Sequence, residues 1–198
     1  MARRPGEPGK KEATHERIVA EAARALRREG YGGVRVAEIM NESGLTHGGF
    51  YAHFASRDAL IAEAAERATQ SSIEALGAMA VARSGDAGGA LAALAERYLS
   101  DAHTARAESG CALAALASET PRQAGEVRAV ATRNVEAFVG LVEGLLPGCD
   151  GDEGRRDEAR VLVAALVGAL VLARAVDDPD LSRELRGAVK RFARRRAR

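Results

Sequence analysis

The residues with the clearest chemical meaning lie in one short stretch, residues 34–54, which reads VRVAEIMNESGLTHGGFYAHF. Gly48 and Gly49 stand together where a short helix should begin, and each costs about 1 kcal/mol relative to Ala in a helix. Two glycines there would let backbone N–H groups approach a phosphate or a base edge closely. One interpretation of the stretch is contact with nucleic acid, and the other is a generic helical hairpin with ordinary surface residues.

Polar side chains that could serve a nucleic-acid contact surround these glycines. His47 is the long polar side chain at the tip, so it is the first candidate for reading a base edge. Hydrogen bonds to phosphate oxygens could come from Thr46, Tyr51, His53 and Arg57. Leu45, Phe50 and Phe54 are expected to pack the second short helix onto its scaffold.

Short helices are predicted on both sides of Gly44, at residues 36–43 and 46–53, the second capped by Thr46. Gly44 suits the turn between them because a positive φ angle costs glycine nothing. Longer helices flank the pair at 15–29 and 57–79, with Thr14 and Ser56 as their caps. Two short helices around a glycine turn are typical of a helix-turn-helix, whose second helix enters the major groove of DNA.

The rest of the chain also has helical periodicity and no strand signal. Helices are predicted at 90–105, 111–118, 121–146, 155–176 and 181–195, with Thr120 capping the third of them. We therefore expect an all-α fold, with an N-terminal three-helix helix-turn-helix module followed by a helical ligand-binding and dimerisation domain. The expected divisions are a flexible basic arm at 1–13, a DNA-binding domain at 14–60 and the second domain at 61–198.

Composition bounds the class of protein. The 198 residues carry a formal net charge of +1, yet the charge is unevenly spread. Residues 1–60 hold ten Lys or Arg against eight Asp or Glu, and residues 183–198 hold eight against one, so the segment between them is acidic. A DNA interaction therefore depends on a few placed groups and not on a polycationic surface. The run RFARRRAR at the C-terminus is expected to be a solvated face that balances the acidic middle.

Targeting and redox signals are absent from the sequence. Residues 1–13 contain no apolar core of a signal peptide, and Arg3 and Arg4 in them could track a minor groove. The longest uncharged apolar run, 161–173, is too short to cross a membrane. Cys111 and Cys149 have no partners at metal-ligand spacing. We expect a cytoplasmic protein with no metal, no cofactor and no catalytic residues.

The stretch GYGGVRVAEIMNESGLTHGGFYAHFASRDALIAEA resembles the DNA-binding module of the tetracycline-repressor (TetR/AcrR) family. The features in register are Gly30-Tyr31, Ile39, Gly44, the run from Gly49 to Phe54, and Ser56-Arg57 with Leu60. The resemblance covers roughly residues 13–65. It implies a homodimeric transcriptional regulator, usually a repressor, that leaves its operator when a small molecule binds.

The resemblance also assigns roles to residues of the hairpin. Thr46, Tyr51 and Arg57 would hold phosphates, His47 and Gly48 would face bases, and His53 would lie against the DNA backbone or brace the hairpin. Val34-Arg35 departs from the family, which commonly has Thr or Ser there. We expect Arg35 to make a longer charged contact with a phosphate instead.

Effector binding and dimerisation are expected in the second domain. Helices 155–176 and 181–195 are the predicted dimer interface, because the first is apolar nearly all round. An apolar or aromatic effector would enter a cavity among the middle helices, lined by Tyr98, His103, Cys111, Leu113, Leu116 and Phe138. Cys111 could be a reactive thiol at a helix start or a buried small hydrophobe.

Two other classes of protein remain open from the sequence. One is a cysteine-dependent enzyme with Cys111 as nucleophile and His103 as base, for which no orienting group or oxyanion site is evident. The other is a helical interaction protein that kept the hairpin but does not read DNA. Loss of DNA affinity on substitution of His47 or Tyr51 would exclude the second.

Overall fold

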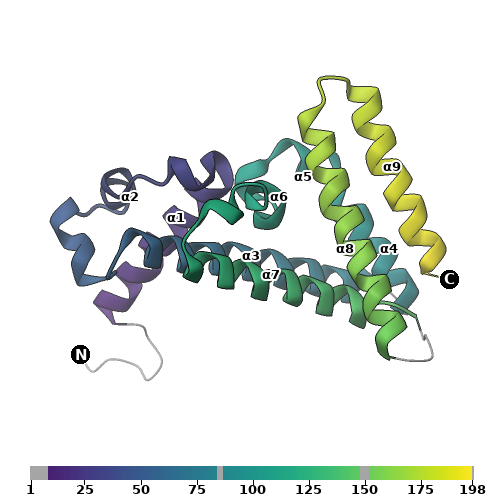
Figure 1. Cartoon of the computed structure of the whole chain (residues 1–198), viewed down its shortest axis with the longest axis horizontal. Helices are drawn as coiled ribbons and strands as arrows, with labels where there is room; N and C mark the ends of the chain where they lie inside the picture. Colours follow the sequence, from purple (N-terminus) through teal and green to yellow (C-terminus); the bar gives the residue numbers. More distant parts are fainter. Residues whose placement is uncertain (1–8, 84–86, 148–151, 198) are drawn as a thin grey trace.

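The computed structural model describes residues 9–83, 87–147 and 152–197, and the regular elements of that part are all helices, as predicted. Helices α1 and α2 lie at one end of the molecule, and α8 and α9 stand at the other (Figure 1). The long helices α3 (Arg57–Arg83) and α7 (Gly125–Gly144) run side by side between the two ends. The all-α fold class is confirmed.

Helix α1 (Lys10–Gly33) starts earlier than predicted. Thr14 is not its cap, since its hydroxyl lies inside the helix and donates to the Lys10 carbonyl at 2.8 Å. The helix start is closed instead by Glu12, whose carboxylate accepts the Gly9 N–H at 3.1 Å. Residues 10–13 are therefore helical and not part of a flexible arm, while Arg3 and Arg4 lie outside the described residues. Gly30, with φ of +73°, breaks the helix at the expected end.

Helix α3 begins as predicted, because the Ser56 hydroxyl accepts the Ala59 N–H at 3.0 Å. Its first turns carry Leu60 and Ile61, both fully buried against α1. The N-terminal core continues past residue 60 and includes Ala68 of α3, Leu116 and Val130. The boundary expected between residues 60 and 61 thus falls inside one continuous helix, which contributes to both hydrophobic cores.

The middle of the chain is more broken than its periodicity suggests. The helix predicted at 90–105 is two helices, α4 (Ala87–Tyr98) and α5 (Asp101–Ala105). Ser100 interrupts it because its hydroxyl accepts the His103 N–H at 3.2 Å and caps α5. A short 3₁₀ turn, η2 (Ala107–Ser109), then leads to α6 (Ala112–Leu116).

Thr120 does not start the next helix. Its hydroxyl donates to the Leu116 carbonyl at 2.9 Å, so it extends the end of α6. Residues Thr120–Arg122 form the 3₁₀ turn η3, and α7 begins at Gly125. The predicted capping pattern was wrong because the Thr120 side chain bonds backwards along the chain and not forwards.

The last two helices match their predicted positions within a few residues. Helix α8 spans Asp152–Ala175 and α9 spans Pro179–Arg196, with Asp178 capping α9 by accepting the Asp180 and Leu181 N–H groups at 2.8 and 3.2 Å. The basic run of α9 is paired with acidic side chains. Lys190 and Arg194 both reach Glu96 on α4, at 3.2 and 2.7 Å.

Within the described residues, no helix is long and apolar enough to cross a membrane, and no three His, Cys, Asp or Glu side chains gather as metal ligands. Cys111 is a buried free thiol, and Cys149 lies outside the described residues.

Candidate nucleic-acid interface

The hairpin at residues 36–52 is built on a small buried scaffold. Helix α2 (Val36–Glu42) buries Ile39 and Met40. Gly44 has φ of +69°, and the next amide, that of Leu45, donates back to the Met40 carbonyl at 2.8 Å. The turn reverses the chain into η1 (His47–Ala52), so the two short elements lie on either side of Gly44 as predicted. The second element is a 3₁₀ helix.

Aromatic packing fixes the inner face of η1. Phe50 and Phe54 are buried and their rings lie 5.5 Å apart. His15 of α1 stacks on Phe54 with ring centroids 4.5 Å apart. The predicted packing role of Phe50 and Phe54 is confirmed, and it leaves the opposite face of η1 to solvent.

The outer face of η1 carries the predicted base-reading residues. His47 and Gly48 are exposed, and Tyr51 keeps 75% of its surface accessible. A Cβ atom added at Gly48 would meet nothing within 4 Å, and one at Gly49 would make an ordinary contact with Met40 at 3.6 Å. The chain's own packing therefore does not require either glycine. The Tyr51 ring makes an edge contact with that of Phe50, with centroids 5.3 Å apart, and the rest of its surface faces solvent.

Thr46 does not cap η1, contrary to the prediction. Its side chain makes no hydrogen bond to the backbone of η1, while its carbonyl accepts the Gly49 N–H at 3.0 Å. The reason is the 3₁₀ geometry, in which each bond spans three residues and closes the first turn with backbone groups alone. The exposed hydroxyl of Thr46 stays available to an outside acceptor.

The two arginines predicted to hold phosphates have partners within the chain. Arg35 is exposed and pairs with Glu38 at 2.8 Å. Arg57 donates from Nε to the Val34 carbonyl at 3.1 Å and from Nη2 to the Tyr31 carbonyl at 2.5 Å. Arg57 therefore ties the start of α3 to the link between α1 and α2, a role that the sequence did not reveal. Phosphate contacts by either arginine remain a prediction.

His53 lies between η1 and α1. Its ring is 6.0 Å from that of His15, whose Nε2 is 2.6 Å from a Glu63 carboxylate oxygen. Burial lowers the pKa of His53, and the nearby His15 and Lys11 lower it further. His53 is thus suited to bracing η1 against α1, the second of its two predicted roles.

The six residues predicted to line an effector cavity do gather in the second domain. Tyr98, Cys111, Leu113 and Phe138 line one small cavity, His103 lines the next, and Leu116 lines a third. The ring of Tyr98 is 5.4 Å from that of Phe138 and 4.9 Å from that of His103. Burial, followed by the neighbouring Cys111, raises the pKa of Tyr98 well above its usual value, so its hydroxyl is neutral.

The hydrogen bonds of His103 bear on the enzyme alternative. Its Nδ1 faces the Tyr98 carbonyl, and its Nε2 accepts the Cys111 backbone N–H at 2.9 Å. A carbonyl can only accept, so the ring is the neutral tautomer with its proton on Nδ1. Burial lowers the pKa of His103 accordingly. Neither ring nitrogen is left to take a proton from the Cys111 thiol, as the enzyme hypothesis requires.

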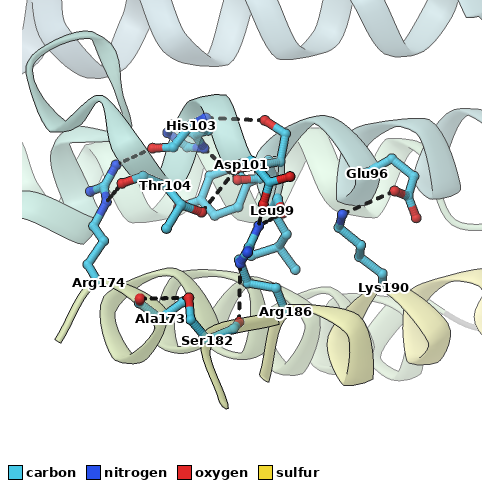
Figure 2. Close-up of polar contacts among 12 residues, drawn as sticks. Glu96, Leu99, Asp101, His103, Thr104, Ala173, Arg174, Ser182, Arg186 and Lys190 are labelled. Atoms are coloured by element: carbon cyan, nitrogen blue, oxygen red, sulfur yellow. Dashed lines mark hydrogen bonds and ion pairs between the residues drawn. The ribbon is translucent and has the colours of Figure 1, made fainter. Parts of the chain in front are cut away.

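Two arginines, one half-buried and one buried, connect these middle elements to α8 and α9 (Figure 2). Arg174 of α8 donates to the His103 and Thr104 carbonyls at 2.6 and 3.2 Å. Arg186 of α9, only 7% exposed, donates to the Leu99 carbonyl at 3.2 Å and pairs with Asp101 at 2.7 Å. These contacts have no local sequence signal, because they join residues 70 or more positions apart.

The hairpin end is attached to the second domain through α1. The Tyr31 amide donates to a Glu119 carboxylate oxygen at 3.1 Å, and the Tyr31 and Thr120 hydroxyls are 3.1 Å apart. Arg27 donates to the Glu108 carbonyl at 2.6 Å. The 3₁₀ turns η2 and η3, which lie before and after α6 in the chain, are therefore in direct contact with α1, the helix that supports the hairpin.

A helix-turn-helix with an exposed polar tip, joined to a helical domain, defines a DNA-binding regulator. Residues 18–64 match the family model of the bacterial regulatory proteins of the tetR family. Residues 18–64 are therefore a DNA-binding domain of the tetR family, as the sequence resemblance predicted.

Solved structures share the whole fold. SCO4454, a TetR-family transcriptional regulator from Streptomyces coelicolor, is 26% identical over 93% of this chain and 96% of its own, with a TM-score of 0.69. A TetR-family regulator from Cytophaga hutchinsonii (16%, covering 94% and 96%) has a TM-score of 0.79, and the reduced form of NemR from E. coli (18%, covering 92% and 96%) has 0.77. The comparison with curated proteins found no similar sequence.

Proposed function

We propose that this protein is a transcriptional repressor that binds operator DNA as a homodimer and is released by a small apolar or aromatic effector. The observation that carries the DNA contact is the outer face of η1, where His47, Gly48 and Tyr51 are exposed to solvent. Thr46 adds a free hydroxyl beside them. A backbone that can approach closely, flanked by hydrogen-bond donors, suits a major groove and its phosphates.

The homodimer would form through α8 and α9. An exposed apolar stripe runs along α8 through Val161, Ala164, Gly168 and Leu172, spaced three or four residues apart, and Leu172 is 52% exposed. Leu181 extends the stripe onto α9. Pairing this stripe with that of a second copy would bury it in a four-helix bundle. Two copies would then present two η1 helices to successive major grooves.

The effector would bind around Tyr98, Cys111, Leu113 and Phe138. This region is connected to α8 and α9 by Arg174 and Arg186, and to α1 by Glu108, Glu119 and Thr120. A molecule that enlarges the small cavities there would shift η2 and η3, and hence α1 and the hairpin. Release follows if the effector favours a dimer geometry that no longer fits the operator.

The DNA contact is tested by selecting bound fragments from genomic DNA and measuring variants on the selected site by fluorescence anisotropy. His47→Ala and Tyr51→Ala should each weaken binding by about 1–3 kcal/mol, a five- to 150-fold effect. Arg133→Ala, exposed on α7 and far along the chain from the hairpin, is the control and should leave the affinity unchanged. Equal affinities for all four proteins would contradict the proposed interface.

A further inference from the structure

A surface groove of about 800 Å³ lies between α6, α7 and the start of α8. This volume falls within the range of small-molecule sites. Its walls come from the end of α6 and η3, from one face of α7 and from two arginines of α8.

The floor of the groove is apolar. Val135 of α7 is 44% exposed there, and Val139 and Leu113 lie beside it. Ala117, Ala129 and Ala131 complete the apolar lining. Such a floor favours a ligand with a hydrocarbon or aromatic body.

The rim of the groove is cationic. Arg128, Arg156 and Arg160 line it, against the single acid Glu136. Arg156 pairs with Glu143 at 3.2 Å and Arg160 with Asp157 at 2.5 Å. Within the described residues, the guanidinium of Arg128 has no hydrogen bond or ion pair. A free guanidinium beside an apolar floor is complementary to an anionic head on an apolar body.

The groove continues inward at Leu113, which lines it and also two small buried cavities behind it. The cavity nearer Tyr98 is about 10 Å³, room for about one water molecule. Tyr98 and Thr69 line this cavity, and both hydroxyl oxygens are buried without a hydrogen bond of good geometry, although the Cys111 thiol lies beside that of Tyr98. Buried polar atoms are nearly always hydrogen-bonded, and a ligand in this cavity would supply a hydrogen-bond partner for the two hydroxyls.

We propose that this groove is the outer half of the effector site and that the effector is an organic anion with an apolar body. Its negatively charged head pairs with Arg128, and its body lies on Val135 and Val139. Rotation of Leu113 lets the body reach the inner cavities and the Tyr98 hydroxyl. This inference rests on the proposed ligand response, and it names the chemical class of the ligand.

The test uses the full chain and two fluorescent probes, 1-anilinonaphthalene-8-sulfonate and its uncharged analogue N-phenyl-1-naphthylamine. Arg128→Gln should weaken the sulfonate by about tenfold and leave the neutral probe unchanged, because only the charged head loses its partner. Arg133→Gln is the matched control, since this arginine is on the same helix, faces Glu66 and lies outside the groove. Circular dichroism melts confirm that both variants are folded.

The inner half is tested by displacing the sulfonate with hexanoate and dodecanoate. Leu113→Ala removes the wall between groove and cavities, so the advantage of dodecanoate over hexanoate should grow several-fold. An unchanged ratio would overturn the inward path.

Other results would overturn the site as a whole. Equal weakening by Arg128→Gln and Arg133→Gln would show unspecific attraction, and a change of oligomeric state with Arg128→Gln would assign the groove to a second copy of the chain. The ligand response is measured separately, as release of operator DNA. Probe binding that depends on Arg128 but releases no operator DNA would contradict the proposed function and support the site. Release of operator DNA that does not depend on Arg128 would support the proposed function and contradict the site.

Discussion

The role of several side chains in this molecule depends on which of their polar atoms already form hydrogen bonds within the chain. Arg57 uses Nε and Nη2 to hold two carbonyls, and His103 uses both ring nitrogens to join Tyr98 to Cys111. Tyr98, in contrast, keeps an unbonded hydroxyl in the core. Arg57 and His103 are therefore structural links in the free protein, and the Tyr98 hydroxyl is the group that the proposed effector would bind.

Acid should destabilise the protein through His103. Burial lowers the pKa of His103 below 6.5, so the unfolded chain binds a proton more readily than the folded chain. Stability contributed by neutral His103 is complete above about pH 6.5 and falls as the pH drops from there toward the lowered folded pKa. Urea unfolding at several pH values from about 5 to 7.5 should show this loss, with His53 acting in the same direction.

The contribution of His103 to the pH dependence of stability can be measured by substitution. His103→Gln should lower the free energy of unfolding by about 1–2 kcal/mol at neutral pH, because two hydrogen bonds are lost or weakened, and should flatten the pH profile. His47→Gln changes an exposed histidine at the tip of η1 and should keep the wild-type slope. If the two variants show the same dependence of unfolding free energy on pH, protonation of His103 does not explain the loss of stability in acid.

At the scale of elements, the turn between η2 and α6 is too tight for a side chain at Gly110. A Cβ atom there would lie 2.8 Å from Arg174 Nη2 and 2.9 Å from His103 Nε2. Gly110→Ala should therefore cost about 1–3 kcal/mol in a denaturant titration. Gly140→Ala, in the interior of α7 where a Cβ meets nothing within 4 Å, should instead stabilise the protein by up to about 1 kcal/mol.

Arg186 holds the end of α4 to α9. Its removal leaves the Leu99 carbonyl without a partner, so Arg186→Ala should cost about 1–3 kcal/mol in thermal or chemical unfolding. Arg183→Ala, on the same helix but exposed and paired only with Asp180, should change stability by less than about 0.5 kcal/mol. Similar losses in both variants would argue against a specific role for the buried guanidinium.

The helix-turn-helix was predictable because its signals are local. Gly44, the Ser56 cap and the aromatic spacing of Phe50 and Phe54 lie within a few residues of the groups they position. The break at Ser100 was not predicted and the cap at Thr120 was wrong, because a hydroxyl can bond forwards or backwards along the chain and packing decides which. The contact of Tyr31 with Glu119 joins residues 88 positions apart, and the sequence carries no local signal for such a pair.

At the scale of the whole molecule, dimerisation should be separable from folding. Leu172→Glu places a charge in the middle of the exposed apolar stripe of α8, so sedimentation should give the mass of one chain and not two. Operator affinity should fall by at least about a hundredfold, because one η1 helix then binds without its partner. Glu74→Lys, an exposed change on α3, is the control and should preserve the dimer. A Leu172→Glu protein that remains dimeric would assign the interface to other helices.

The two ends of the molecule are joined by the long helix α3 and by polar contacts that are suited to transmitting a shift. Glu119 and Thr120 reach Tyr31, and the Glu108 carbonyl reaches Arg27, while Arg174 and Arg186 hold the far side of the same elements to α8 and α9. Movement of η2 and η3 would therefore displace both the hairpin and the helices α8 and α9, through which the dimer is proposed to form.

The central claim is that η1 makes this protein a specific DNA-binding regulator. The direct measurement is a mobility-shift titration with the DNA upstream of its own gene against a scrambled sequence of equal length, at low and physiological salt. The account predicts a shift that prefers the upstream DNA and weakens as salt rises, since a few phosphate contacts contribute to it. Equal affinity for both sequences, or no shift at either salt concentration, would contradict the claim.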